Sequence, residues 1–305
     1  MSTERLVEEL RPGAFAVAYR MLGSVSEAED IVQEGLLRLH RALRAGDRIE
    51  SPRAYLSTVV TRLCIDELRS ARARREHYVG EWLPEPLVAS DDEDDPARHA
   101  EMADSLSLAL LVVLESLSPE QRAAFLLREV FDYSYDQIAT IVGTTEANAR
   151  QLAARARRHV EERRPRHEAS RQERDRLADR FLAAAERGDL AGLEELLAHD
   201  VVLHGDGGGK APALARALHG RARVARTVLA WMGVAARAGV SLRRTEINGQ
   251  PGALILDRDE RVAAVWALDV AEGQIQAMRS VVNPDKLRHI GPVADFASLI
   301  RRSPG

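Results

Sequence analysis

Cysteine, lysine and aromatic residues are all scarce in this chain of 305 residues. The single cysteine, Cys64, excludes an intrachain disulfide framework and a thiolate zinc cluster, and it favours a reducing compartment. Two of the 43 basic residues are lysines, Lys210 and Lys286, so almost every cation is a guanidinium group. Aromatic residues make up 4% of the chain, apolar residues 45% and charged residues 30%, which is typical of a soluble protein rich in helices.

Long apolar runs are also lacking. The longest, from Leu106 to Leu114, is interrupted by Ser107 and followed by Glu115, well short of the roughly 20 residues that span a membrane. The first residues, MSTERLVEELRPG, carry acids and no apolar stretch, which excludes a secretory signal there. We therefore expect a cytoplasmic protein with no membrane partner.

Acidic and basic residues are segregated along the chain, although the net charge is only −4. Nine acids and one arginine lie between residues 77 and 104, which predicts a solvated, flexible linker. Ten arginines and five acids lie between residues 150 and 176. The sequence therefore predicts an acidic linker between two helical segments, the second of which ends in a basic stretch.

Helical periodicity dominates the first half of the chain. Ser26 precedes three acids at the start of one expected helix, where the positive end of a helix dipole favours negative charge. A second helix is expected to start near Ser51 and Pro52, because serine is a good N-cap and proline is tolerated in the first turn. Three or four shorter helices are expected within residues 105–164.

The pattern changes beyond about residue 172. Two helices are expected at about 172–186 and 189–197, followed by a strand-like stretch over 201–210, a helix at about 219–237 and four alternating or β-rich runs between 241 and 282. Residues 292–305 form a tail with at most one or two helical turns. This order predicts an α+β domain after an all-α half.

The segment from 134 to 160 has the pattern of a helix-turn-helix. A short helix starts at Tyr135, Gly143 lies at the turn, and Thr144 or Thr145 can cap a second helix. At about 100° per residue, one face of the second helix is small and apolar, and the other carries Asn148, Arg150, Gln151, Arg155 and Arg158. Arginine pairs with guanine edges and amides pair with adenine edges, so this face suits a DNA major groove. A solvated helix in an ordinary bundle is the alternative.

The helix expected over 51–76 has a second basic face. One side carries Thr58, Arg62, Arg69 and Arg72, and the opposite side carries Leu56, Val59 and Leu63. A basic helix joined by a linker to a helix-turn-helix suggests two points of contact along one DNA duplex. Charged runs are more often plain solvated faces, so both interpretations stay open on the residues alone.

Three stretches resemble the bacterial extracytoplasmic-function (ECF) sigma factors. SEAEDIVQEGLLRLHRAL resembles their segment that binds core RNA polymerase, and SPRAYLSTVVTRLCIDELRSARARR resembles their helices for the minus-ten promoter element. LSPEQRAAFLLREVFDYSYDQIATIVGTTEANARQLAARARRHV resembles their fourth domain. Together these stretches cover about half of the chain in the order and spacing of that family.

This resemblance implies a subunit that directs core RNA polymerase to promoter DNA. Its second domain would grip the β′ clamp helices through Asp30, Gln33, Glu34 and Arg38, and would capture and melt the minus-ten element through Thr58, Arg62, Arg69 and Arg72. Its fourth domain would touch the β flap and read the minus-thirty-five element through Asn148, Arg150, Gln151, Arg155 and Arg158. Arg62 and Leu152 stand where many members have asparagine and arginine, so the resemblance does not define the promoter sequence.

Three further motifs resemble those of an ECF subgroup with a fused SnoaL-like domain of the NTF2-like fold. WLPEP contains Trp82, Pro84, Glu85 and Pro86; DGGGK contains Asp206, Gly207, Gly208, Gly209 and Lys210; NPDKL contains Asn283, Pro284, Asp285 and Lys286. That resemblance implies a curved sheet wrapped by helices around a cone-shaped pocket. The extra domain would regulate the sigma factor, so that no separate anti-sigma factor is required.

Each motif also has a plainer interpretation. WLPEP could be a stiff linker, but Trp82 in an acidic segment favours docking onto the C-terminal domain. NPDKL could be a strand-to-helix corner capped by Asn283. DGGGK lacks the spacing of a phosphate-binding P-loop, and its glycines allow a backbone to approach a partner closely. The two lysines fall in these last two motifs, which suggests that a compact ammonium group is required there.

An enzymatic role for the C-terminal domain is the alternative. Cyclases and isomerases of the SnoaL type use an aspartate or histidine facing the pocket, and His199, Asp200, His204 and Asp206 cluster around one strand. Alternation along a strand puts His204 and Asp206 on the same face, toward either the pocket or solvent. Spacing assigns no catalytic set, so we expect no catalytic residue, metal or cofactor, and an unidentified small-molecule ligand for the pocket.

The predicted organisation is two all-α domains, a helical bundle and a helix-turn-helix, followed by an α+β domain of the cone-shaped SnoaL-like type. We assign residues 1–77 to sigma region 2, 78–104 to the acidic linker, 105–166 to sigma region 4, 172–290 to the SnoaL-like domain and 291–305 to a tail.

Overall fold

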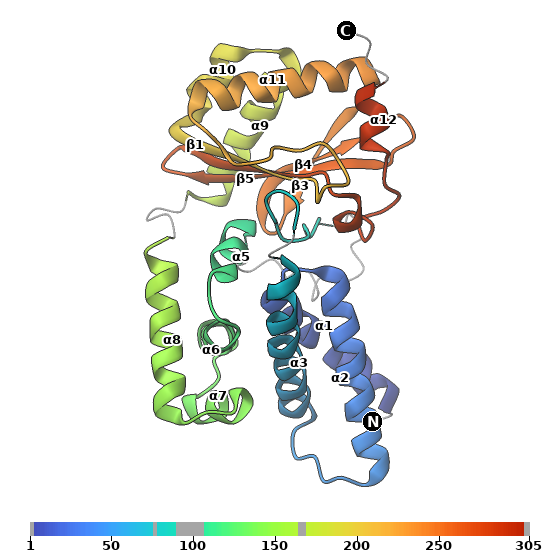
Figure 1. The fold of residues 1–305 in the computed structure, drawn as a ribbon, viewed down its shortest axis with the longest axis vertical. Helices are drawn as coiled ribbons and strands as arrows, with labels where there is room; N and C mark the ends of the chain where they lie inside the picture. Colours follow the sequence, from blue (N-terminus) through green and yellow to red (C-terminus); the bar gives the residue numbers. More distant parts are fainter. Residues whose placement is uncertain (1–2, 76–77, 90–106, 164–168, 302–305) are drawn as a thin grey trace. The chain divides into compact units, whose positions relative to one another are not determined.

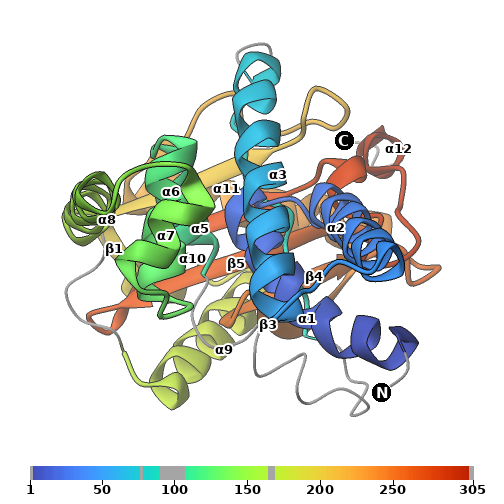
Figure 2. The ribbon, with the colours of Figure 1, turned by 90° about the horizontal axis from the view of Figure 1, so that it is seen from below.

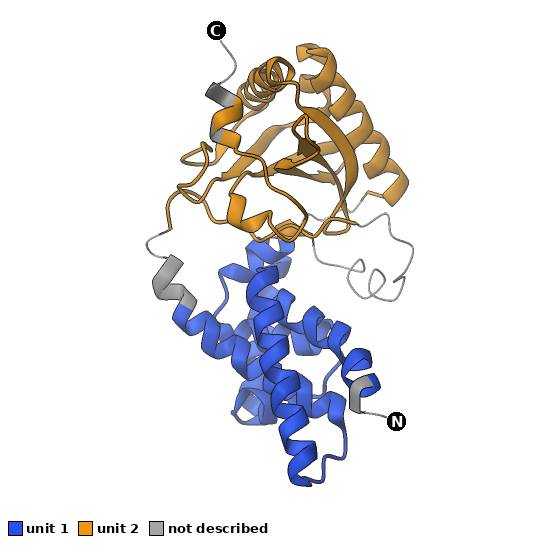
Figure 3. Ribbon diagram, turned by 90° about the vertical axis from the view of Figure 1, so that its right-hand side faces the viewer, with its two compact units in different colours: residues 1–76, 94–106, 110–164 blue, residues 77–93, 107–109, 165–305 orange. Residues whose placement is uncertain are grey.

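The chain forms two compact units (Figure 3). The computed structural model describes residues 3–75, 78–89, 107–163 and 169–301. The first unit contains residues 1–76, 94–106 and 110–164. The second contains residues 77–93, 107–109 and 165–305. No helix in the described ranges is both long enough and apolar enough to cross a bilayer.

Three long helices begin the first unit: α1 (Thr3–Leu22), α2 (Val25–Ala45) and α3 (Pro52–Arg75). The N-cap of α2 is Ser24, whose side chain accepts a hydrogen bond from the amide of Glu27 at 3.2 Å, so the expected start at Ser26 is two residues late. Ser51 caps α3 as predicted, with the Ala54 amide 3.2 Å from its hydroxyl. The sequence therefore predicted both helices and misplaced one cap.

Helices α2 and α3 pack closely at Gly35. A Cβ atom there would lie 2.9 Å from Val60 Cγ2 and 3.1 Å from Leu56 Cδ1, so only glycine fits without a shift. The deeply buried positions of α3 include Leu56, Val60, Cys64 and Leu68. The predicted apolar face is therefore rotated slightly, because Val59 and Leu63 are only half-buried.

Four shorter helices lie within residues 107–163, as predicted: α5 (Leu108–Glu115), α6 (Pro119–Glu129), α7 (Tyr135–Val142) and α8 (Glu146–Glu161). Ser118 and Gln121 form a reciprocal capping box at the start of α6. Gly143 ends α7 with φ of 76°, a left-handed conformation that glycine adopts without strain, and Thr145 caps α8. Helices α6 and α7 pack against α3, and α8 lies on their far side (Figure 2).

The second unit is an α+β domain, as predicted. Helices α9 (Arg171–Arg187) and α10 (Leu190–Leu196) precede strand β1 (Leu197–Asp206), the short strand β2 (Leu218–His219) and helix α11 (Arg221–Ala238). Strands β3 (Ser241–Ile247), β4 (Gln250–Leu256), β5 (Val262–Ala271) and β6 (Gln274–Val281) follow, and then the 3-10 turn η1 (Pro284–Lys286) and α12 (Phe296–Arg301). The helices α9 to α11 lie together along the sheet (Figure 1).

The six strands form one sheet in the order β2-β1-β6-β5-β4-β3, in which β1 and β6 are parallel and the other neighbours are antiparallel. Strand β1 ends at Asp206, so the strand-like stretch over 201–210 is shorter than its sequence suggests. Gly208 and Gly209 have φ of 57° and 71°, and the Lys210 amide bonds to the Gly207 carbonyl at 2.9 Å, which turns the chain. Strands β1 and β6 thus bring DGGGK and NPDKL to the same end of the sheet.

Candidate functional site

A buried ion pair joins the DGGGK and NPDKL motifs. Asp206 at the end of β1 is fully buried, and its Oδ2 atom lies 2.7 Å from the ammonium group of Lys286, which is 6% exposed. Burying a charge is costly unless the charge is paired and hydrogen-bonded, so both groups need a complete set of partners. The rest of that set comes from a segment more than 120 residues away in the sequence.

The linker residues 78–89 supply those partners. The Tyr78 hydroxyl donates to Asp206 Oδ1 at 2.6 Å, and the Leu83 amide donates to Asp206 Oδ2 at 2.8 Å. The Lys286 ammonium donates to the Leu83 carbonyl and lies 4.2 Å from the centroid of the Trp82 ring and 5.0 Å from that of Tyr78. The aromatic rings therefore hold the cation by cation–π attraction while the linker backbone completes its hydrogen bonds.

Burial and the neighbouring Asp206 carboxylate raise the pKa of Tyr78 well above its usual value, so this phenol keeps its proton and acts as a donor. Its oxygen in turn accepts a hydrogen bond from Asn283 Nδ2 at 2.9 Å. Asn283 also caps η1 by accepting from the Asp285 amide at 3.1 Å. The NPDKL motif is thus both the predicted corner and part of the surface that binds the linker.

The glycines of DGGGK let this loop approach the linker. A Cβ on Gly208 would lie 2.2 Å from Asn283 Nδ2 and 2.9 Å from the Tyr78 hydroxyl, and one on Gly209 would lie 3.1 Å from Val79 Cβ. A Cβ on Gly207 would strike the Ala211 carbonyl at 2.1 Å. Lys210 forms an exposed ion pair with Asp285 and so links the two motifs at the surface.

The WLPEP segment continues along the C-terminal domain. Pro84, Glu85 and Pro86 are buried. His289 contacts two of them, because its Nε2 lies 2.8 Å from the Pro86 carbonyl and its Nδ1 lies 4.0 Å from Glu85 Oε2. The backbone of Leu87 exchanges hydrogen bonds with Asn248 at 2.8 and 2.9 Å, and Val88 forms a β-bridge with Ile247. The predicted docking of the linker is therefore present in the structure.

Sequence reasoning missed several residues of this site, namely Tyr78, Glu81, Leu83, Asn248 and His289. Asn248 and Gly249 form a two-residue hairpin turn with φ of 50° and 69°, a pattern that is readable as a turn but gives no hint of a partner. Tyr78 carried a weak signal, since it is one of only five tyrosines and lies close before WLPEP. Their roles depend on contacts between distant parts of the chain.

Two of the four residues weighed for catalysis, His204 and Asp206, bind the linker instead. His204 and Asp206 share one face of β1, and His204 Nδ1 lies 2.6 Å from Glu81 Oε1. His199 and Asp200 are exposed. None of these four is among the described residues that line the cavity on the other face of the sheet. The geometry thus assigns His204 and Asp206 to binding the linker.

The four residues predicted to bind core polymerase form one stripe of α2. Asp30, Gln33 and Arg38 are exposed, and Arg38 donates to Glu34 at 2.7 Å. Their spacing of three, four and eight residues places them on one face of the helix, with Leu37, 43% exposed, between them. The exposed face of α2 thus carries charged and amide groups around one leucine.

The residues predicted to hold the minus-ten element lie on α3, and two of them contact the helix-turn-helix. Arg62 donates to the carbonyls of Thr140 at 2.8 Å and Ile141 at 3.0 Å, at the C-terminal end of α7 where the helix dipole favours a cation. Arg69 forms an ion pair with Glu120 of α6 at 2.7 Å. The Thr58 hydroxyl donates to the Ala54 carbonyl at 2.8 Å, and the side chain of Arg72 lies outside the described residues.

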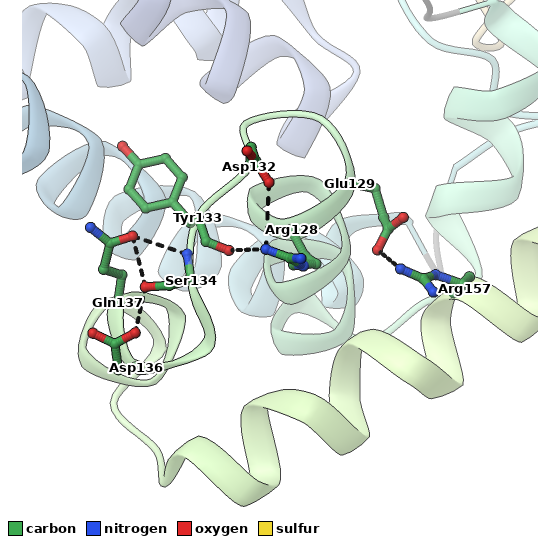
Figure 4. Close-up of polar contacts among 8 residues, drawn as sticks. All are labelled: Arg128, Glu129, Asp132, Tyr133, Ser134, Asp136, Gln137 and Arg157. Carbon is green, nitrogen blue, oxygen red and sulfur yellow. Dashed lines mark hydrogen bonds and ion pairs between the residues drawn. The ribbon is translucent and has the colours of Figure 1, made fainter.

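The helix-turn-helix is held by contacts around the turn before α7 (Figure 4). The Gln137 side chain accepts from the Ser134 amide at 3.0 Å, Arg128 donates to the Tyr133 carbonyl at 3.1 Å, and Arg157 of α8 pairs with Glu129 of α6. The first two contacts stabilise the turn before α7, and the Arg157–Glu129 pair holds α8 against α6.

The predicted outer face of α8 is exposed, as the helical wheel indicates. Its residues are Asn148, Arg150, Gln151, Arg155 and Arg158, and the inner face is Ala149, Ala153, Ala156 and Val160, all buried. Leu152 is half-buried against the same cluster. Asn148 donates to Thr144 at 2.7 Å, and Arg150 pairs with Glu146 and lies 4.8 Å from the Tyr135 ring centroid.

Models of protein families match three parts of the chain. Residues 6–74 match sigma-70 region 2, residues 107–160 match sigma-70 region 4 and residues 178–282 match a SnoaL-like domain. The chain is 40% identical to the ECF RNA polymerase sigma factor SigJ of Mycobacterium tuberculosis, over 92% of this chain and 91% of that protein. It is 35% identical to a probable ECF sigma factor, SigI, of the same species, over 89% and 90%. The crystal structure of that SigJ matches with a TM-score of 0.76 and 36% identity, covering 96% of this chain and 100% of that one.

The two lysines differ in their surroundings, which gives a matched test of the buried ion pair. Lys286→Arg should weaken linker docking by about 1–3 kcal/mol, because a larger planar cation does not fit between Trp82, Leu83 and Asp206. Lys210→Arg should have little effect, since the Lys210 side chain is 55% exposed. Cleavage after Glu81 by a glutamyl-specific protease measures the undocked fraction. Equal cleavage rates in the two variants would contradict this assignment.

Proposed function

The chain belongs to the ECF family of RNA polymerase sigma factors, and from that premise we propose how its surfaces divide the work of initiation. Residues 1–77 act as region 2, residues 105–166 as region 4 and residues 172–290 as a regulatory domain in cis. The observation that carries the regulatory part is the linker, whose residues 78–89 complete the buried Asp206–Lys286 ion pair of the C-terminal domain.

Core RNA polymerase binds the exposed stripe of α2. Asp30, Gln33, Glu34 and Arg38 contact the β′ clamp helices, with Leu37 as the apolar centre of the contact. Region 4 touches the β flap. Support for this arrangement comes from the mixture of charged groups around one exposed leucine, since an apolar centre with a polar rim is usual in protein interfaces.

Promoter DNA binds the outer face of α8 and the basic face of α3. The small buried alanines of α8 bring this helix close to its own bundle, while its arginines and amides project outward for base edges and phosphates. The arginines of α3 bind the minus-ten region. In this structure Arg62 and Arg69 of α3 contact α7 and α6. We therefore expect region 2 and region 4 to separate when α3 binds DNA.

The C-terminal domain regulates the sigma regions through the linker that connects them. Docking fixes residues 78–89 on the C-terminal domain, whereas release adds these residues to the free chain between region 2 and region 4. An extended chain gains roughly 3.3–3.6 Å per residue, so docking changes how far apart the two DNA-binding regions can reach. This intramolecular control serves in place of a separate anti-sigma factor.

Charge reversal on α2 tests the proposed polymerase surface. Asp30→Lys should weaken binding to core RNA polymerase by about ten to a hundredfold, because it places a like charge where an opposite one is needed. Glu9→Lys makes the same charge change at an exposed position of α1 and should leave the affinity unchanged. Co-purification with core enzyme and transcription from the holoenzyme provide the measurement. Two variants that bind equally well would refute the surface, and a wild-type chain that fails to support specific transcription would refute the function.

Two arginines of α8 test the proposed DNA surface. Arg155→Ala should weaken promoter binding by about 1–3 kcal/mol, because Arg155 projects from the outer face of α8. Arg157→Ala removes the same charge from the same helix, but Arg157 pairs with Glu129 inside the motif and should contribute less to binding. Titration of the holoenzyme onto a promoter identified by transcription compares the two. A larger loss for Arg157→Ala would show that the reading face has been assigned to the wrong side of α8.

A further inference from the structure

The C-terminal domain contains a partly open cavity of about 340 Å³. It lies between α11, α12 and one face of the sheet, and is lined by residues such as Trp231, Ala235, Ala264, Trp266 and Phe296. The indole rings of Trp231 and Trp266 lie 6.2 Å apart between their centroids. A volume in this range is typical of sites for small organic molecules.

The lining indicates which molecules fit. Among the described residues that line the cavity, none carries a charged side chain, and the polar side-chain groups are the Ser280 hydroxyl and the two indole N–H groups. An ion placed there would lose its hydration without gaining a counter-charge. A dry cavity of about 150 Å³ holds benzene, so this one has room for roughly two rings. The matching ligand is an uncharged, mostly apolar molecule of two rings with few polar atoms.

The cavity and the linker share the end of β1. Successive residues of a strand point to opposite faces of the sheet. Gly205 lines the cavity, whereas its neighbours His204 and Asp206 bind the linker. The same alternation follows β6, where Val282 lines the cavity and Asn283 binds Tyr78. One layer of backbone therefore separates the ligand site from the site that holds the linker.

We propose that this cavity binds an uncharged, mostly apolar ligand of about two rings and that its occupancy strengthens linker docking across β1 and β6. Displacement of these strand ends would distort the cavity lining at Gly205 and Val282, and would at the same time release Asp206 and Asn283 from the linker. A ligand that binds only the form in which the linker is docked stabilises that form by mass action. The consequence for transcription rests on the regulatory role proposed above for the linker, whereas the binding and the coupling do not.

A pair of fluorescent probes tests the ligand class. 1-Naphthol is a neutral molecule of two fused rings, and naphthalene-1-sulfonate carries a negative charge on the same aromatic skeleton. The neutral probe should bind the full-length protein at one site and at least about tenfold more tightly than the sulfonate, because the cavity offers the anion no partner. Equal affinities, or binding of the sulfonate alone, would overturn the assignment of a neutral ligand.

Two phenylalanine substitutions on α11 test the location. Ala235→Phe places a ring in the cavity and should weaken binding of the neutral probe by about tenfold or more. Ala236→Phe adds the same ring at the next, exposed position and should leave binding unchanged. Unaltered far-UV circular dichroism in both variants shows that they fold. Probe affinity that does not differ between the two variants would overturn the cavity as the site.

Hydrogen exchange of the linker amides tests the coupling. At about ten times the Kd of the neutral probe, exchange of the Leu83 amide should slow by up to about tenfold in the wild-type protein and stay unchanged in Ala235→Phe. Unchanged exchange in the wild type would overturn the coupling. This experiment does not measure transcription, so a negative result would overturn the coupling and leave the proposed regulatory function untouched. The regulatory function is tested separately, by comparing Lys286→Arg with the wild type in a transcription assay without probe.

Discussion

A carboxylate and an ammonium group are buried together in the C-terminal domain, and the linker between the two sigma regions supplies the hydrogen bonds that they lack. Asp206 accepts from the Tyr78 hydroxyl and the Leu83 amide in addition to Lys286. Without the linker, Asp206 would lose two hydrogen bonds, and Lys286 would lose one together with both aromatic neighbours, so docking stabilises the pair in its buried position. The arrangement makes a segment of sigma linker part of the structure of the regulatory domain.

This constraint explains features that composition alone left unconnected. Lysine is almost absent from the chain, yet Lys286 stands where a compact ammonium fits between two aromatic rings and a backbone carbonyl. The glycines of DGGGK stand where a Cβ would crowd Asn283, the linker residue Val79 or the loop's own backbone. The scarce aromatics Tyr78 and Trp82 cover the same cation. Their residue types follow from the need to bury one ion pair completely.

Local patterns in the sequence predicted much of the fold and less of the site. The exposed face of α8, the helices of the all-α half and the strands β3 to β6 were readable because 3.6-residue and two-residue periods are set by neighbouring side chains. The two-residue strand β2 is too short to show a period. The contacts of Arg62 with α7 and of Tyr78 with Asp206 join residues 78 or more positions apart, so they follow from the packing of whole elements.

The account depends on the linker being docked in the free protein, and hydrogen exchange of the Leu83 amide measures this directly. This amide donates to a carboxylate that is fully buried. If the linker is docked, the Leu83 amide exchanges far more slowly than in an unstructured chain, because its hydrogen is held by the buried Asp206 carboxylate. Exchange at the rate of an unstructured chain would show that residues 78–89 are free, and would contradict control of the sigma regions through this linker.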